Sequence, residues 1–266
     1  MKSRDSERTG QIQSVMRAIS VLNALATSND GLTLTEIAQT VTLPPSTVHR
    51  LLTTLQQARY VRFDADRGGW QVGVTCFSVG NAFLRSRDLV TITRPYLRRL
   101  MEECGETANL AIRDNMDMVY LAQAECREMM RALAKPGARV PIAGSAVGKT
   151  LLARMPEGEV ARLLEIPDPN TRTRKTINAL PRMLDELARV RDQLYAIDDE
   201  EHAVGLRCVA AAVFDHLGEP LGAISLSGPT ARIPDDRIAK LGGVVRDIAR
   251  EATTALGGAW PTQGAP

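Results

Sequence analysis

Residues 44–57 constrain the chain more than any other stretch, because they combine an apolar and a polar helical face. The apolar positions follow the i, i+3, i+4, i+7 spacing of one face: Val48, Leu51, Leu52 and Leu55. The opposite side is rich in donors and almost free of acid: Ser46, Thr47, His49, Arg50, Thr53 and Thr54. The proline pair before Ser46 suits an opening turn, where no amide donor is missed. This pattern predicts a helix whose apolar stripe is buried and whose polar face points outward.

Two helical patterns precede this one. The apolar positions of the first are Val15, Ala18, Ile19, Leu22 and Leu25, and those of the second are Leu34, Ile37, Ala38 and Val41. Thr33 and Glu36 have capping-box spacing, in which each satisfies a free amide at the helix start. A short helix, a turn at Thr42 and Leu43, and a third helix with a polar outer face form the helix-turn-helix layout.

In that layout the third helix enters the major groove of DNA, and its early residues reach the base edges. The candidate DNA contacts on it are Pro45, Ser46, Thr47, His49 and Arg50. Arg50 can pair with a guanine edge or clamp a phosphate. Two strand patterns, 60–63 and 70–73, surround a turn and predict a wing with Arg67 at its tip. The alternative is a plain three-helix bundle whose polar face is merely solvated.

Composition alone does not identify nucleic-acid binding, because the net charge is only +2. No uncharged apolar run of about eighteen residues occurs, and the polar start lacks a secretory signal, so we expect a cytoplasmic protein without a membrane partner. The cysteines are widely separated and never form CxxC, which predicts reduced thiols, no disulfide framework and no metal site: Cys76, Cys104, Cys126 and Cys208.

The 266 residues, 44% of them apolar, can form two compact domains. A helical pattern at 74–85 suggests a linker. Beyond it, helical patterns at 91–104, 147–154, 179–193 and 238–252 alternate unevenly with strand patterns at 108–112, 118–122, 208–214 and 221–227. We therefore predict an α+β chain: a winged helix-turn-helix in residues 1–73, a linker helix in 74–88, and in 89–266 an α/β domain with an antiparallel sheet flanked by helices.

The segment from Gly144 to Thr150 invites comparison with a phosphate-binding loop. Three residues separate its glycines where that motif needs four, and no acidic strand end that would hold magnesium is obvious. We therefore expect no nucleotide and no other cofactor. The helix start still offers free amides at Ala146 and Val147 to a small anion such as a carboxylate.

A second group of polar residues lies further along the chain. Ser225 and Ser227 share one face of a predicted strand, and Cys208 lies on the strand before it, so these side chains can converge. Alternatively, Cys208 is a small core residue and the two serines are ordinary polar residues of a strand, beside an acidic turn at 198–201. A Cys208 and His202 nucleophile pair lacks a visible orienting group and oxyanion hole. A metal site of His202, Cys208 and an acid lacks the spacing. We predict no catalytic residue.

Three segments carry a family resemblance. TLTEIAQTVTLPPSTVHRLLTTLQQARYV resembles the DNA reader of the IclR family of bacterial regulators, and PIAGSAVGKTLLA and DDEEHAVGLRCVAAAVFDHLGEPLGAISLSGPTARIPDDRI resemble its effector domain. The similarity extends from about residue 15 to 258. It implies a regulator rather than an enzyme, with residues 89–266 as the ligand-sensing domain. It also implies a homodimer or tetramer that binds double-stranded, inverted-repeat operator DNA.

The resemblance is nearest to glyoxylate-responsive members and implies a small oxo acid effector, either glyoxylate or pyruvate. Carried over, the ligand-binding positions are the amides of Ala146 and Val147, the polar groups of Asp198, Cys208, Ser225 and Ser227, and an apolar wall at Met129, Ala132 and Leu206. The chain has Ala-Val where the family usually has Gly-Ala, and Ala132 is smaller than the usual residue, so pocket volume can differ. The rival class is a cysteine-dependent or nucleotide-using enzyme with an N-terminal interaction module.

Chemistry limits how such a site can work. Amide and serine donors suit a carboxylate through charge-assisted hydrogen bonds. An ionised Asp198 only accepts, so it must meet a donor, such as a hydroxyl of hydrated glyoxylate, or be protonated. Cys208 can donate weakly or add reversibly to the aldehyde.

Overall fold

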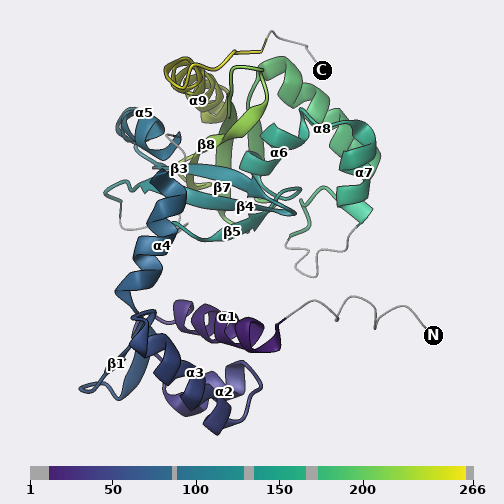
Figure 1. Cartoon of the computed structure of the whole chain (residues 1–266). Helices are drawn as coiled ribbons and strands as arrows, with labels where there is room; N and C mark the ends of the chain where they lie inside the picture. Colours follow the sequence, from purple (N-terminus) through teal and green to yellow (C-terminus); the bar gives the residue numbers. More distant parts are fainter. Residues whose placement is uncertain (1–11, 86–88, 129–134, 166–172, 262–266) are drawn as a thin grey trace, which may run out of the picture. The chain divides into compact units, whose positions relative to one another are not determined.

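The computed structural model describes residues 12–85, 89–128, 135–165 and 173–261. The chain divides into two compact units, residues 1–87 and 88–266 (Figure 1), and each is described by itself. Among the described residues, no helix has both the length and the apolar character needed to cross a membrane.

The first unit is a small helical bundle with a hairpin. Its elements are α1 (Gln13–Ala26), α2 (Leu34–Thr40), α3 (Pro45–Gln57), β1 (Val61–Asp64), β2 (Gly69–Val72) and α4 (Val74–Arg85). One core cluster joins them: Val21, Leu25, Ile37, Ala38, Val48, Leu52, Val61 and Trp70. Leu32 forms an isolated β-bridge with Trp70, which ties the hairpin to the segment between α1 and α2.

Local sequence signals set the helix boundaries of this unit. The predicted capping box is present, because Thr33 Oγ1 accepts from the Glu36 amide at 3.3 Å and Glu36 Oε2 accepts from the Thr33 amide at 2.8 Å. Pro45 opens α3 as its first residue. Thr42 has a φ of 53°, so the turn between α2 and α3 passes through the left-handed region. The helix-turn-helix prediction is confirmed, with the third helix beginning where the proline pair placed it.

The apolar positions of α1 divide between the core and the surface. Val21, Ala24 and Leu25 are its buried residues. Val15 and Ile19, which belong to the same apolar periodicity, are 50% and 43% exposed. The small core of this unit therefore covers only the second half of α1.

The second unit contains a six-stranded sheet with the order β5-β4-β3-β8-β7-β6, in which every neighbouring pair is antiparallel. The strands are β3 (Thr107–Asp114), β4 (Asp117–Ala124), β5 (Arg139–Pro141), β6 (Ala196–Asp199), β7 (Leu206–Phe214) and β8 (Pro220–Pro229). The predicted α+β class and antiparallel sheet are confirmed. The sequence patterns missed β5 and β6, which contain one β-branched residue each and no aromatic residue.

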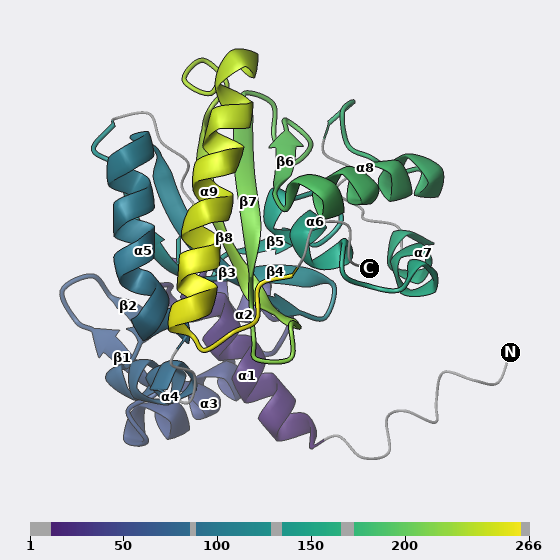
Figure 2. The same cartoon turned by 90° about the horizontal axis from the view of Figure 1, so that it is seen from above.

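Helices cover both faces of this sheet (Figures 1 and 2). The helices are α5 (Leu89–Cys104), α6 (Ala146–Leu152), α7 (Glu157–Glu165), α8 (Leu180–Gln193) and α9 (Asp235–Ala255). Helices α6 to α8 share a core cluster with Cys208 and Ala210 of β7. Helices α5 and α9 lie side by side on the other face, with α9 against β7 and α5 against β3. The periodicity missed α7.

Candidate functional site

The polar face of α3 is exposed. The predicted DNA contacts Pro45, Ser46, His49 and Arg50 are exposed and Thr47 is half-buried, whereas Val48 and Leu52 on the opposite side are fully buried. Thr53 and Thr54 donate their hydroxyl protons to the carbonyls of His49 and Arg50, both at 2.9 Å. Because these two hydroxyls are engaged by the helix itself, the early part of α3 offers the donors that can reach a groove.

The hairpin β1–β2 is the predicted wing. Phe63 and Trp70 hold its strands together through a tilted ring contact with centroids 5.2 Å apart. Arg67 at the tip pairs with Asp30 at 2.9 Å, a partner that the sequence did not indicate. The two side chains are 58% and 89% exposed. Such an exposed pair is worth at most about 1 kcal/mol, so a phosphate can replace Asp30 at little cost.

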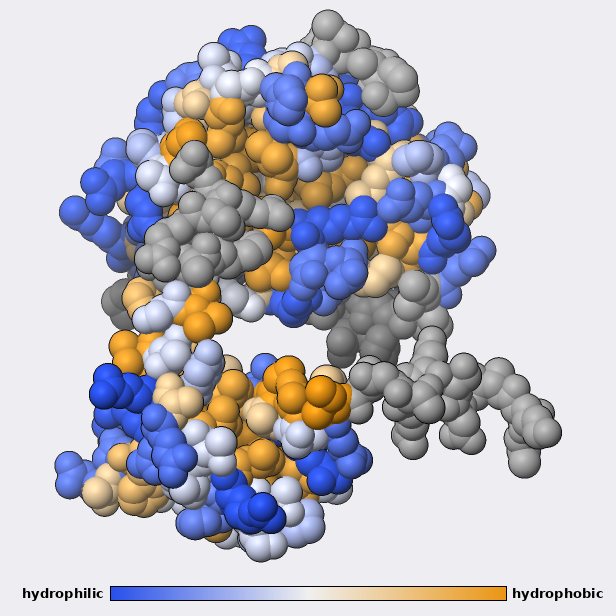
Figure 3. Space-filling model, viewed as in Figure 1, coloured by the Kyte–Doolittle hydropathy of each residue, from blue (hydrophilic) through white to orange (hydrophobic). Residues whose placement is uncertain are grey.

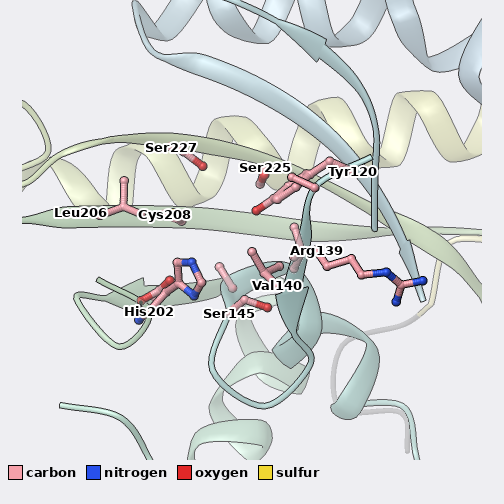
Figure 4. A pocket seen from close by; sticks show the side chains of 13 residues that line it. Tyr120, Arg139, Val140, Ser145, His202, Leu206, Cys208, Ser225 and Ser227 are labelled. Carbon is pink, nitrogen blue, oxygen red and sulfur yellow. Dashed lines mark hydrogen bonds between the residues drawn. The ribbon is translucent and has the colours of Figure 1, made fainter. Parts of the chain in front are cut away.

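A cavity of about 190 Å³ lies in the second unit, between the sheet and α6 (Figure 4). It is lined by Tyr120, Ala138, Arg139, Val140, Ser145, Ala146, Val147, Asp198, His202, Leu206, Cys208, Ser225 and Ser227. Seven of the predicted ligand positions are therefore brought together: Ala146, Val147, Asp198, Leu206, Cys208, Ser225 and Ser227. Met129 and Ala132 lie outside the described residues.

The sheet register explains this convergence. Asp198 on β6 is the partner of Cys208 on β7, and Cys208 is the partner of Ser227 on β8. Directly opposed residues on neighbouring antiparallel strands share a face, so these three side chains form one row. Ser225, two residues before Ser227, lies on the same face one row further along.

Sequence reasoning missed several lining residues: Tyr120, Ala138, Arg139, Val140 and Ser145. It considered His202 only as a partner for a nucleophile or as a metal ligand, and favoured neither role. In the structure, burial alternates along β4 and Tyr120 is one of its buried residues. Nothing in the local sequence of β5 indicates that this strand borders a cavity.

The two serines differ in their hydrogen bonding. Ser227 Oγ accepts from Asn109 Nδ2 at 3.4 Å. Ser225 Oγ is buried and has no hydrogen-bond partner among the described residues. Leaving a buried polar group unpaired costs about 1–3 kcal/mol, and such groups are rare in native proteins. An unpartnered hydroxyl that lines a cavity marks a position where a ligand oxygen can be accommodated.

Asp198 is only 1% exposed. Its Oδ1 accepts from the backbone amides of Glu201 at 2.8 Å and His202 at 3.2 Å. Burial, and secondarily the nearby Glu201 carboxylate, raises the pKa of Asp198 to about 7, and the amide hydrogen bonds oppose part of that shift. The carboxyl group can therefore hold a proton near neutral pH and act as a donor, which is one of the two roles expected for it.

Cys208 is buried, and this burial together with the charge of Asp198 raises the pKa of its thiol far above the ordinary value. The thiolate is the nucleophilic form of cysteine, so this environment opposes both the Cys208–His202 nucleophile pair and addition of Cys208 to an aldehyde. Within the described ranges, no group of three His, Cys, Asp or Glu side chains is arranged to hold a metal ion.

In the segment from Gly144 to Thr150, the lysine is engaged in ion pairs inside the protein and the second glycine allows close packing. Lys149 is 1% exposed, and its Nζ lies 3.0 Å from Glu186 Oε1 and 2.5 Å from Glu201 Oε1. Its charge is thus neutralised inside the protein. A Cβ on Gly148 would lie 1.9 Å from the carbonyl oxygen of Ile142, so that glycine allows α6 to approach the preceding backbone.

Ser145 caps α6, accepting from the Gly148 amide at 3.2 Å and donating to the Pro141 carbonyl at 2.7 Å. The predicted amide positions, Ala146 and Val147, are the first two residues of this helix. The first amides of a helix have no intrahelical acceptor, and these two border the cavity.

The guanidinium of Arg139 points away from the two serines (Figure 4). It pairs instead with Asp114 and with Asp117, the latter at 3.1 Å. Arg139 therefore does not supply a positive charge beside the serines, and an anion there would be held mainly by hydrogen bonds.

Comparison with known proteins agrees with this geometry. The model of the IclR helix-turn-helix domain matches residues 14–65, and that of the bacterial transcriptional regulator IclR C-terminal domain matches residues 81–254. The chain is 44% identical over 252 residues to the transcriptional repressor IclR of Escherichia coli K12, covering 94% of this chain and 92% of that one. It is 39% identical to the transcriptional repressor AllR of the same strain, covering 92% and 90%.

A solved structure extends the similarity to the fold. The crystal structure of the Thermotoga maritima IclR matches with a TM-score of 0.78 and 26% identity, covering 93% of this chain and 100% of that one. The named relatives are transcriptional repressors, not enzymes, so the rival enzyme interpretation is discarded. The chain belongs to the IclR family of DNA-binding transcriptional regulators.

Proposed function

We propose that a small oxo acid, with glyoxylate as the first candidate, binds in the cavity and changes the affinity of the protein for operator DNA. The observation that carries this proposal is the buried hydroxyl of Ser225, which has no hydrogen-bond partner among the described residues and borders a cavity that also presents Asp198 and Ser227. A carboxylate oxygen is the acceptor that such a hydroxyl lacks.

The binding mode follows from the lining groups. Ser225 and Ser227 donate to the carboxylate, together with the first amides of α6 at Ala146 and Val147. Asp198, protonated near neutral pH, donates to the oxo group or accepts from a hydroxyl of the hydrated aldehyde. The Cys208 thiol is a weak donor, and Leu206 forms part of the apolar wall.

The size of the cavity favours a small ligand. An engineered cavity of about 150 Å³ in another protein binds benzene, and this one is about 190 Å³. Both glyoxylate and pyruvate fit such a volume, whereas drug-sized ligands occupy pockets of roughly 300 Å³ or more.

Titration calorimetry tests the proposal with glyoxylate, pyruvate and a bulky aromatic oxo acid, first alone and then with an operator fragment selected by the protein from random DNA. We expect saturable binding of a small acid, recovered chemically unchanged, with an affinity that differs when DNA is present. Absence of binding by every acid in the panel would remove the sensor role.

We further propose that the protein acts as a homodimer, or a pair of dimers, on inverted-repeat operator DNA. The exposed half of α1 carries an apolar patch (Figure 3) of Ile12, Val15, Met16 and Ile19, which are 43% to 68% exposed. Val74 and Phe77 on α4 are also exposed. Clustered exposed apolar side chains mark interaction sites, and a two-fold dimer matches a two-fold operator.

Sedimentation tests this assembly. An Ile19→Glu variant is expected to lose the dimer and, with it, operator binding, whereas Arg50→Ala stays dimeric. In this proposal residues 1–73 form the reader, 74–88 the linker helix and 89–266 the sensor, and the protein works in the cytoplasm, where the DNA is.

A further inference from the structure

We propose that Asn109 and Gln123, which do not line the cavity, orient the hydroxyl of Ser227 so that it donates to the ligand. This hydrogen-bond relay makes Asn109 and Gln123 positioning residues that favour a carboxylate over a ligand offering a donor. The inference rests on the proposed function, because it explains how the same cavity selects its ligand.

The relay runs across three neighbouring strands. Asn109 on β3 is fully buried, and its register partners are Ser225 on β8 and Gln123 on β4. Gln123 Nε2 donates to Asn109 Oδ1 at 3.0 Å. Asn109 Nδ2 in turn donates to Ser227 Oγ at 3.4 Å. The relay therefore starts at the partly buried Gln123 and ends at a cavity-lining hydroxyl.

The direction of each bond follows from the donor and acceptor inventory. A carboxamide has one accepting and one donating end, and a serine hydroxyl has a single proton. Because Gln123 presents a donor to the oxygen of Asn109, the nitrogen of Asn109 faces Ser227. Ser227 accepts on that side, so its own proton turns away from Asn109, toward the neighbouring Cys208 sulfur or toward a ligand in the cavity.

Reversing the carboxamide of Asn109 would have the opposite effect. Its two neighbouring nitrogens would then face each other, and its oxygen would accept the proton of Ser227. The relay thus keeps Ser227 as a donor beside Ser225, whose hydroxyl is unpartnered. Two hydroxyl donors on one strand face match the two acceptor oxygens of a carboxylate.

Gln123→Glu tests this polarity with almost no change in shape. A carboxylate at this position only accepts, so Asn109 turns its nitrogen toward it and presents its oxygen to Ser227. We expect glyoxylate affinity to fall about tenfold, the usual size of a lost charge-assisted hydrogen bond. Gln123→Met breaks the relay without adding charge and is expected to weaken binding by about two- to threefold.

The Ser227→Ala background separates the relay from other effects of these substitutions. If Gln123 acts through Ser227, then Gln123→Glu and Gln123→Met lose most of their effect once the hydroxyl is absent. A general effect of charge or of sheet packing would persist there. Thermal unfolding of each variant checks that the fold is kept, and Gln123→Met in the same cycle replaces Gln123→Glu if the acid does not fold.

The outcomes are distinct. If the wild-type protein binds no acid of the panel, the proposed function fails and the relay fails with it. If the wild type binds glyoxylate but Gln123→Glu binds it equally well, or loses as much affinity in the Ser227→Ala background, only the relay is overturned. Loss of affinity that disappears in that background supports it.

Discussion

The two units hold their functional polar groups in opposite environments. On α3, Ser46, His49 and Arg50 are exposed on one continuous helix. In the sensor, Asp198 and Ser225 are each 1% exposed and come from strands far apart in the sequence. An exposed donor stays hydrated until its partner binds, so it does not lower the stability of the fold. A buried donor loses its hydration on folding, which costs free energy unless a hydrogen bond replaces it. Substitutions of these groups in the reader should therefore leave the unfolding free energy unchanged, whereas in the sensor burial ties a group such as Asp198 to stability as well as to ligand binding.

The largest difference in unfolding free energy is expected between substitutions of two lysines, each of which pairs with two carboxylates. Lys149 is buried between Glu186 and Glu201, and Lys149→Met leaves those carboxylates without their cation. Breaking a buried pair costs about 3–5 kcal/mol of unfolding free energy. The matched control is Lys175→Met, since the Lys175 side chain is 49% exposed and exposed ion pairs contribute little to stability. Urea unfolding compares them, and equal losses would contradict the assigned difference.

Arg50→Ala tests the reader side of the comparison. We expect operator affinity to fall by roughly 10- to 100-fold, because a bidentate base contact is worth about 1–3 kcal/mol. Glyoxylate affinity and unfolding free energy should stay unchanged, since Arg50 is exposed. Native-gel retention and calorimetry measure the two affinities. Arg174→Ala, an exposed arginine of the sensor, is the control, and unaltered retention of Arg50→Ala would refute the contact.

Asp198 should make ligand binding by the sensor depend on pH. Its pKa is raised to about 7, so the carboxyl is protonated below that pH and ionised above it. A bound carboxylate favours the protonated form, so glyoxylate affinity should be constant below pH 7 and fall by up to about tenfold per unit above it. Calorimetry between pH 5.5 and 8.5 measures the slope, and Asp198→Asn should remove it. An unchanged slope in Asp198→Asn would assign the proton to another group.

The same shift affects stability in a defined direction. Because the pKa of Asp198 is higher in the folded protein than its ordinary value of 3.8, the folded state binds this proton more tightly. That stabilisation is complete below about pH 4 and is lost as the pH rises through 7. The ligand-free wild type should therefore lose more unfolding free energy over this window than Asp198→Asn does.

The smallest effects come from two serines of the cavity. Ser225 has no hydrogen-bond partner in the described part of the chain, so Ser225→Ala should weaken glyoxylate binding about tenfold, or about 1.4 kcal/mol, with no loss of stability. Asp198→Ala should weaken it by a similar factor. Ser145 caps α6, so Ser145→Ala should instead cost about 1 kcal/mol of unfolding free energy. Calorimetry and urea unfolding on both serine variants test whether one loses affinity and the other loses stability. Full affinity in Ser225→Ala would remove that residue from the site.

The sequence predicted the elements whose pattern is local. The Thr33–Glu36 capping box, the proline start of α3 and the long strands β7 and β8 all follow from neighbouring residues. It did not indicate which part of the apolar side of α1 would be covered, and the first half is exposed. It missed β5 and β6, which have one β-branched residue each and no aromatic residue and form by pairing with β4 and β7, whereas the similarly short β1 and β2 were predicted.

The candidate site divides in the same way. The strand pattern placed Ser225 and Ser227 on one face with Cys208 on the preceding strand, and the family resemblance added Asp198 and the ligand-binding role. Tyr120 and Asn109 were missed, since their place beside the cavity depends on the strand order rather than on their neighbours in the chain.

The sequence by itself determined the helix-turn-helix and the polar face of α3, because helical periodicity and capping are properties of residues within a few positions of each other. Only the tertiary structure decided what Lys149 does, since its partners Glu186 and Glu201 lie 37 and 52 residues away. It likewise decided that Asp198 titrates near pH 7, because desolvation depends on everything that surrounds a side chain.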